Sequence, residues 1–374
     1  MPVDLSSRLQ PVLSIARETA SNVDSSAAYP ADTVAALRES GLLGLTLPED
    51  IGGLGGGPKE LVEVISSLAS ACGSTAMIYL MHVSAAMTVA AGPPSAWPDL
   101  LPALADGRSL GTLAFSEAGS RSHFWAPVSR AEHRGDAVHV DAPKSWVTSA
   151  GEADVYVTST GNADTEGAVD LFAFPADTAG ISITGQFHGL GLRGNASCPM
   201  AFDIDDAASY TIGDPGGGFD ILLGTVMPWF NLGNAGVSIG LSQAVTAAAV
   251  RHTSAANLEH LNHSLSALPT IRAQLAKMSL DLATTRAYID QTAARIAEPA
   301  EDTVLHVLGV KAAANDAALR ITDTAMRVCG GAAFSEHLQV ERYFRDARAG
   351  HVMAPTADVL YDFYGKAITG QPLF

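Results

Sequence analysis

Three histidines are candidates for acid–base chemistry. Imidazole titrates close to neutral pH, so a histidine side chain can both accept and donate a proton. His82 lies in a predicted helix, His123 directly follows Ser122 in a loop, and His351 precedes Ala354 by three positions. His351 is therefore one turn from Ala354 if that segment is helical. Alternatively, each is a structural histidine whose ring nitrogens are hydrogen-bonded within the fold.

The composition is that of a compact, folded chain. With 374 residues it can bury a large core, organised as two or three subdomains. Hydrophobic residues make up 47% and charged residues 16%, which favours a helix-rich soluble protein over a disordered one. The formal net charge of −17 argues against a nucleic-acid partner, because such a surface repels phosphates. We expect a cytoplasmic protein.

The cysteines and the apolar segments exclude other classes. Cys72, Cys198 and Cys329 are isolated and odd in number, which predicts neither a disulfide framework nor a metal site. The stretch from Met1 to Leu13 is broken by polar residues and is unlike a signal peptide. No window approaches 18 uncharged apolar residues, so we expect no membrane-spanning segment.

Three regions of the chain differ in pattern. Residues 1–110 are predicted to be helical, with one glycine-rich break. Residues 111–215 hold short β-branched or aromatic runs between Gly, Asp and Pro clusters, which predicts an antiparallel sheet domain, a small barrel or sandwich. Residues 216–374 are predicted to form a helical bundle, with long helices over 228–256, 268–297 and 301–328. The order of helices, sheet and helices argues against a doubly wound fold.

Motifs spread over nearly the whole chain resemble those of the acyl-CoA dehydrogenase superfamily. Gly41–Gly53 resembles an early Pro-Glu-x-x-Gly-Gly loop, and Phe115–Ser122 resembles Thr-Glu-Pro-x-Ala-Gly-Ser. Lys144–Ser149 is similar to Lys-x-Trp-Ile-Thr-Asn, and Arg327–Phe334 to Gln-x-x-Gly-Gly-x-Gly-Tyr. Arg342–Thr356 is similar to the Arg-Asp-Ala signature near the C-terminus. The resemblance implies a mainly α fold with an N-terminal helical domain, a central β domain and a C-terminal bundle.

The resemblance also implies an FAD cofactor. In the family, a loop Ser or Thr and a strand Thr hydrogen-bond the isoalloxazine, and these roles fall on Ser116 and Thr148, with Trp146 packing against the ring. Ser122 belongs to the same loop, and Thr356 is a further FAD contact by analogy. Fixed donors beside the ring tune the potential of a flavin. Alternatively, Trp146 and Thr148 are an ordinary pair on a strand.

Two other segments are implied to contact FAD. Arg251 corresponds to an arginine that reaches the pyrophosphate of FAD bound in the neighbouring subunit, which implies a homodimer or homotetramer. Arg327 stands where the family has glutamine and is placed to contact an FAD phosphate. Gly330 and Gly331 allow the backbone to approach the cofactor closely. Alternatively, Arg251 is a solvated surface charge.

The chain departs from the family at the catalytic position. The family's glutamate, which removes the substrate α-proton, follows the aspartate of Arg-Asp-Ala by eight positions, and here that position holds Ala354. Some members carry the glutamate on the helix after the sheet domain, where this chain has Phe230. The charged residues before Ala354 are predicted to form an ion-pair network that holds the cofactor wall: Glu341, Arg342, Arg345, Asp346 and Arg348.

Three functions remain open. The first is α,β-dehydrogenation of an acyl-CoA or other acyl thioester, with an electron-transfer flavoprotein as acceptor and with His82, His123 or another group in place of the glutamate. The second is a monooxygenase fed by a separate flavin reductase, which needs no carboxylate base and for which His82, His123 and Ser122 are suitable proton-managing groups. The third is a non-catalytic partner subunit of a heteromeric dehydrogenase, whose other subunit supplies the glutamate.

Overall fold

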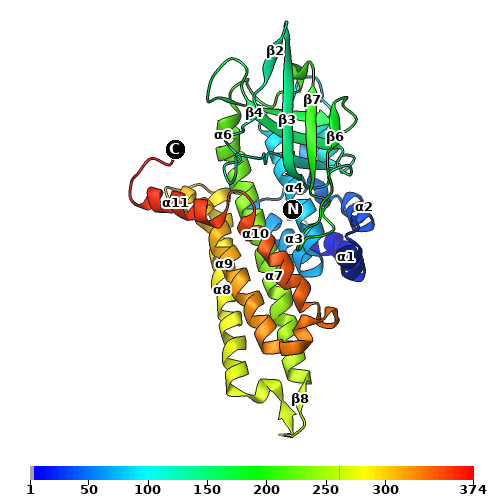
Figure 1. Cartoon of the computed structure of the whole chain (residues 1–374), viewed down its shortest axis with the longest axis vertical. Coiled ribbons are helices and arrows are strands. Elements are labelled where there is room, and N and C mark those ends of the chain that lie inside the picture. The colour runs from blue at the N-terminus through cyan, green and yellow to red at the C-terminus, as the bar shows by residue number, and fades with distance from the viewer. Residues whose placement is uncertain (1–3, 261) are drawn as a thin grey trace.

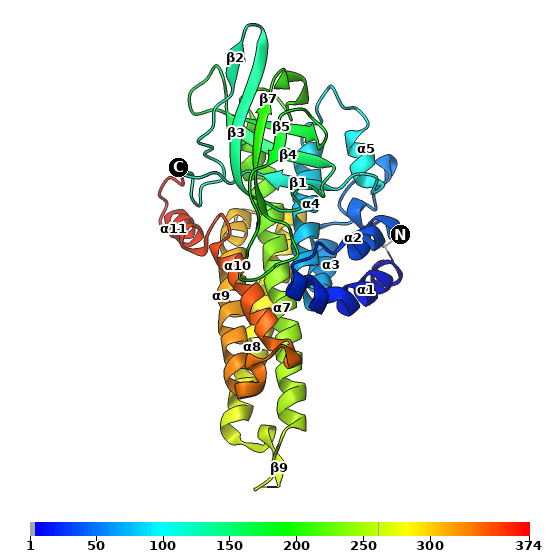
Figure 2. The same cartoon turned by 45° about the vertical axis from the view of Figure 1, so that its right-hand side comes forward.

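The computed structural model describes residues 4–260 and 262–374, and its elements fall into three spatial groups (Figure 1). The strands between residues 111 and 204 lie at one end of the molecule, and a long helical bundle extends away from them. The N-terminal helices pack where the strands and the bundle meet (Figure 2). The predicted mainly α fold with a central β domain and a C-terminal bundle is confirmed.

The N-terminal helices bury apolar faces against one another and against the bundle. They are α1 (Leu5–Ser26), α2 (Ala31–Glu39), α3 (Pro58–Ala71), α4 (Gly73–Ala90) and α5 (Leu100–Ala105). Helix α3 begins with a proline, and the Gly57 nitrogen donates a hydrogen bond to the Glu60 carboxylate over 3.0 Å. Both features stabilise the first turn of a helix.

Helix α4 corrects one prediction. It has 18 residues, a mean hydropathy of 1.2 and few charges, so by length and composition it is apolar enough to cross a membrane. The expectation that no such window exists was wrong. However, 89% of the helix is buried inside the fold, where it packs against α3, α7 and β1. This burial accounts for its hydrophobicity without a membrane.

The strands of the central region form two sheets. Their orders are β1-β4-β5 and β2-β3-β7-β6. The strands are β1 (Gly111–Ala114), β2 (Glu132–Arg134), β3 (Ala137–Val147), β4 (Val155–Gly161), β5 (Val169–Pro175), β6 (Ile181–Ile183) and β7 (Cys198–Ile204). The prediction of antiparallel pairing is wrong for β1 and β4, which are parallel because the chain passes through the other sheet between them. A separate apolar core includes Tyr156, Phe172, Phe174 and Phe202.

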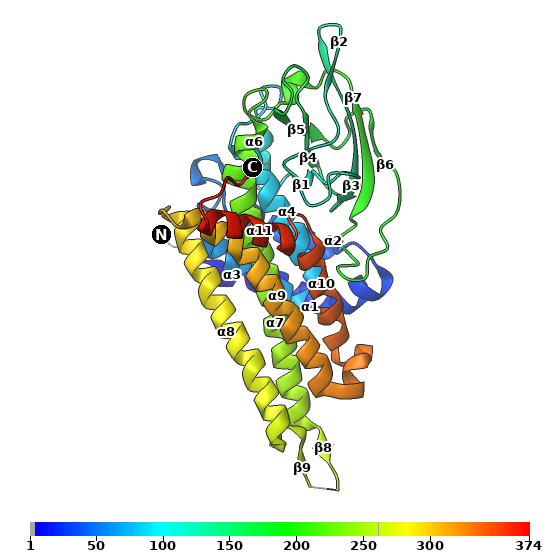
Figure 3. The ribbon, with the colours of Figure 1, turned by 60° about the vertical axis from the view of Figure 1, so that its left-hand side comes forward.

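The bundle is built around α7. Its helices are α6 (Gly218–Ile221), α7 (Met227–Ala255), α8 (Pro269–Ala297), α9 (Thr303–Cys329), α10 (Val340–Val352) and α11 (Ala357–Ile368), and a small hairpin, β8 (Asn257–Leu258) and β9 (His263–Ser264), joins α7 to α8. The three long helices match their predicted ranges to within two residues. Gly240 lets α3 approach α7 closely, because a Cβ there would lie 2.2 Å from the Ser66 carbonyl oxygen. Helix α11 runs across the end of the bundle that faces the sheets (Figure 3).

Candidate functional site

A cavity of about 890 Å³ lies between the sheets and the bundle. Its walls come from β1 and the loop after it, from β3, from the segment between β6 and β7, and from the turn between α10 and α11. Large apolar side chains line it, among them Phe115, Phe124, Trp146, Phe230 and Met353. A concave, mainly apolar cavity with a few polar groups is the usual form of a cofactor or substrate site.

The cavity brings together five of the residues that were predicted to surround the flavin. Ser116, Ser122, Trp146, Thr148 and Thr356 all line it. The backbone nitrogen of Thr356 donates to Ser122 Oγ over 2.6 Å, and Ser122 Oγ donates to Thr356 Oγ1 over 3.0 Å. Thr148 is buried, with Oγ1 at 3.1 Å from the Ser197 hydroxyl. Hydroxyl groups are therefore fixed along the wall of an apolar cavity.

A buried ion pair joins the loop of residues 115–122 to β3. Lys144 Nζ lies 2.5 Å from Glu117 Oε1, and the other carboxylate oxygen accepts the backbone N–H groups of Val128 (2.5 Å) and Ser129 (2.8 Å). Burial opposes ionisation of Glu117, but the charge and hydrogen bonds of Lys144, with those of Ser129, outweigh it and lower the pKa. Both residues belong to recognised motifs, yet their pairing was not predicted.

Lys311 on α9 holds the turn between α10 and α11. Its ammonium group is completely buried and donates to the backbone carbonyls of Gly350 (2.9 Å), Met353 (3.0 Å) and Pro355 (2.8 Å). Ala354 lies within this turn and lines the cavity. This role of Lys311 was not predicted from the sequence. The sequence does indicate it, because a lysine on the buried face of a predicted helix needs hydrogen-bond partners inside the fold.

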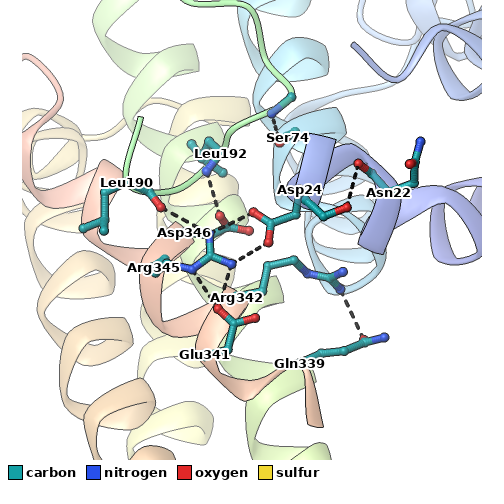
Figure 4. Close-up of polar contacts among 12 residues, drawn as sticks. Asn22, Asp24, Ser74, Leu190, Leu192, Gln339, Glu341, Arg342, Arg345 and Asp346 are labelled. Atoms are coloured by element: carbon teal, nitrogen blue, oxygen red, sulfur yellow. Dashed lines mark hydrogen bonds and ion pairs between the residues drawn. The ribbon is translucent and has the colours of Figure 1, made fainter. Parts of the chain in front are cut away.

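Of the ion-pair network predicted on α10, only Glu341 and Arg345 form ion pairs within the part of the chain that the structure describes, while Arg342 donates to the Gln339 side chain over 3.2 Å (Figure 4). Arg345 donates to both carboxylate oxygens of Asp24 on α1, at 2.5 and 2.8 Å, and to Glu341 over 2.7 Å. Asp346 is fully buried and accepts the Leu192 backbone N–H over 2.7 Å. Burial raises the pKa of Asp346 to about 6, against the opposing effect of that hydrogen bond. The network therefore ties α1 and α10 to the segment that carries Leu192 in the cavity wall.

The structure does not support His82 or His123 as the acid–base group. His82 is buried on α4, with Nε2 at 3.0 Å from the Leu43 carbonyl oxygen, while the Gly111 N–H donates to Nδ1 over 3.0 Å. Burial lowers its pKa to about 4, so the ring is neutral and both nitrogens are engaged. His123 is exposed beside Trp125, at 5.3 Å between ring centroids, and does not line the cavity.

The residues predicted to contact FAD phosphates lie outside this cavity. Arg251 is exposed and lines a second cavity of about 470 Å³ with Arg17 and Gln339. Arg327 is exposed near the end of α9, and nothing described lies within 4 Å of a Cβ built at Gly330 or Gly331. Their contacts with FAD, including FAD of a neighbouring subunit, stay predictions.

No described residue of the cavity wall offers a free carboxylate or imidazole as a proton acceptor. Among the described lining residues, Glu117 and Arg121 have the only ionisable side chains, and Glu117 is neutralised by its lysine. Ala354 and Phe230, the two positions where a glutamate is expected, both line the cavity. His351 does not. The hydroxyls and aromatic rings of the wall fit an isoalloxazine, which needs flat apolar surface and fixed hydrogen-bond donors.

These features define a flavoprotein oxidoreductase scaffold. The sequence matches the models of the acyl-CoA dehydrogenase N-terminal domain over residues 14–108, the middle domain over 112–204 and the C-terminal domain over 216–369. The chain therefore belongs to the acyl-CoA dehydrogenase superfamily. Membership brings a flavin cofactor, consistent with FAD.

Similar proteins include dehydrogenases and other flavoproteins. The probable acyl-CoA dehydrogenase YngJ of Bacillus subtilis is 27% identical over 91% of this chain and 90% of its own length. Human mitochondrial short-chain specific acyl-CoA dehydrogenase is 27% identical over 91% of this chain and 83% of its own. Butyryl-CoA dehydrogenase from Megasphaera elsdenii has a TM-score of 0.89 at 22% identity, covering 99% of this chain and 100% of its own. TdsC from Paenibacillus sp. A11-2, solved with FMN and indole, has a TM-score of 0.87 at 19% identity, covering 98% of this chain and 96% of its own.

Proposed function

We propose that the protein is a flavin-dependent monooxygenase that receives electrons from a separate flavin reductase and acts on an apolar substrate. One observation carries the proposal: no described residue of the cavity wall offers a free carboxylate or imidazole. α,β-Dehydrogenation needs a base that removes a proton from carbon, whereas oxygen insertion does not. Overall, one atom of dioxygen enters the substrate and the other leaves as water, with two electrons and two protons supplied through the reductase.

The chain's own residues bind, orient and exclude water. Phe115, Trp146 and Phe230 provide the apolar wall that keeps water from the reacting groups. Ser122 Oγ donates to Thr356 Oγ1, so the hydroxyl proton of Thr356 has no acceptor among the described residues and can be donated into the cavity. A bound flavin supplies the two-electron carrier that reacts with dioxygen once reduced.

Dehydrogenation of an acyl thioester is the second candidate. The relatives with 27% identity over 91% of the chain, named as acyl-CoA dehydrogenases, favour it. In this case the proton acceptor comes from outside the described cavity wall, for example from the catalytic subunit of a heteromeric enzyme. An electron-transfer flavoprotein would then accept the electrons.

The test uses FAD-loaded protein in two arms. Under anaerobic conditions, a series of acyl-CoA thioesters is added and the flavin absorbance is followed. In air, the protein is supplied with a flavin reductase, NADH and indole as an aromatic probe, followed by other apolar molecules, and products are analysed by mass spectrometry. We expect no bleaching in the first arm and an oxygenated product in the second. Bleaching by a thioester, or FAD binding with no turnover in either arm, would overturn the monooxygenase proposal in favour of the dehydrogenase or the partner-subunit function.

A further inference from the structure

Arg121 lies in a loop of the cavity wall that is anchored on both sides. Before it, Glu117 is fixed by Lys144 and by the backbone of the segment that follows the loop. After it, Ser122 is hydrogen-bonded to Thr356. Beyond the exposed His123, Phe124 and Trp125 are buried in the core. The backbone of Arg121 is therefore held in place, while its side chain remains exposed.

The charge of Arg121 has no partner within the described part of the chain. No acidic side chain lies within ion-pairing distance of its guanidinium, and no hydrogen bond satisfies it there. The other ionisable residue of the cavity wall, Glu117, is already compensated by Lys144 at 2.5 Å. The cavity therefore carries one uncompensated positive charge, in a chain whose formal net charge is −17.

The backbone at Arg121 is unusual for a long side chain. Its φ of 47° lies in the left-handed region, which is sterically unfavourable for residues other than glycine. In the motif that Phe115–Ser122 resembles, the position of Arg121 is a glycine, which is the residue best suited to the left-handed conformation. Strained conformations of this kind concentrate at ligand sites, where an interaction offsets their cost.

We propose that Arg121 binds a phosphate group of a ligand in the cavity. A guanidinium presents a planar fork of N–H donors that matches two phosphate oxygens at once. Two ligands of this superfamily carry such groups: the FAD pyrophosphate and the phosphates of coenzyme A. The proposal rests on the flavin cavity of the proposed function, although not on which reaction takes place there.

Arg121→Gln tests the proposal, because it removes the charge and the guanidinium fork while keeping a polar, shorter side chain. Arg134→Gln serves as the control, since Arg134 is an exposed arginine on β2 that does not line the cavity. Dissociation constants of the flavin-free protein are measured for FAD and riboflavin by fluorescence quenching, and for coenzyme A and pantetheine by calorimetry. Thermal denaturation checks that each variant is folded.

We expect Arg121→Gln to weaken binding of one phosphate-bearing ligand by about ten- to a hundredfold, the usual effect of losing a charge-assisted hydrogen bond. If the variant binds FAD more weakly but riboflavin as tightly as the wild type does, Arg121 contacts a phosphate of the cofactor. Weaker coenzyme A with unchanged pantetheine and FAD identifies the substrate phosphate and supports the thioester function. Equal affinities of wild type and variant for all four ligands would overturn the proposal. Wild-type protein that binds neither flavin would instead contradict the flavin cavity itself.

Discussion

Lys311 and Pro355 are joined by a fully buried hydrogen bond, in which the ammonium group donates to the proline carbonyl oxygen over 2.8 Å. An ammonium group has three N–H donors, and the carbonyls of Gly350, Met353 and Pro355 accept all of them. No carboxylate takes part in these contacts. The turn that presents Ala354 and Thr356 to the cavity therefore depends on a lysine of another helix.

Replacing Lys311 with methionine keeps the length of the side chain but leaves three carbonyls without their donor. An unsatisfied buried polar group costs about 1–3 kcal/mol, so Lys311→Met should lower the free energy of unfolding by several kcal/mol in total. Urea denaturation measures the change. Lys366→Met is the control, because Lys366 is half-exposed in a pair with Asp362 and should lose no more than about 0.5 kcal/mol. Equal stability of the two variants would contradict the role of Lys311.

Asp346 should make stability depend on pH. Its pKa in the folded protein is about 6, above that of an exposed aspartate, so between about pH 4 and 6 the folded state binds more protons than the unfolded state. Its contribution to stability is therefore present at low pH and is lost as the pH rises through 6. Asp346→Asn should flatten this part of the profile, as measured by thermal denaturation at a series of pH values. The exposed Asp358→Asn should leave the profile as it is.

Glu117 and Lys144 should behave as a coupled pair. Glu117→Gln leaves a buried lysine without its counter-ion, and breaking a buried pair in this way costs about 3–5 kcal/mol. The double variant Glu117→Gln/Lys144→Met removes both charges and should lose less than the sum of the single changes. Glu132→Gln, on the exposed strand β2, is the control. Additive losses in denaturant unfolding would show that the pair is not coupled.

Thr148→Val should alter a bound flavin. It removes a hydroxyl from the cavity wall, together with its 3.1 Å contact with Ser197, whose hydroxyl still donates to Asn195 Oδ1 over 3.0 Å. We expect a change in the absorbance spectrum or in the reduction potential of bound FAD, because a donor near the ring tunes both. Thr160→Val on β4, in the other sheet, is the matched control, since Thr160 is buried and its hydroxyl has no hydrogen-bond partner among the described residues. An identical spectrum and potential would remove Thr148 from the flavin site.

The sequence predicted regular elements better than tertiary contacts. Apolar periodicity located the long helices, because the spacing of apolar residues within a helix shows which of its faces is buried. The same reasoning cannot show that the ring nitrogens of His82 meet Leu43 and Gly111, which come from other parts of the chain. Similarly, Arg348 was grouped with the ion-pair network but instead places its guanidinium 3.5 Å from the ring centre of Phe344.

Ala354 gives the sharpest test between the two candidate functions. It lines the cavity in the turn held by Lys311, so a carboxylate at this position would enter the cavity wall. Proton abstraction by a positioned base is worth about 10²–10⁴-fold in rate. If the cavity admits an acyl thioester, Ala354→Glu should create or strengthen anaerobic flavin reduction by acyl-CoA by a factor of this size.

Pro355 restricts the backbone of Ala354, so Ala354→Glu/Pro355→Gly is tested beside the single change. Ala354→Gln has the same size without a base and is the matched control, which should reduce flavin no faster than wild type. Stopped-flow absorbance after mixing with acyl-CoA thioesters of different lengths measures the rate. If a glutamate variant reduces its flavin while wild type and Ala354→Gln do not, a thioester α-carbon lies beside position 354. If neither glutamate variant reduces flavin while both retain FAD, the cavity is not a thioester site, as expected for a monooxygenase that acts on another apolar substrate.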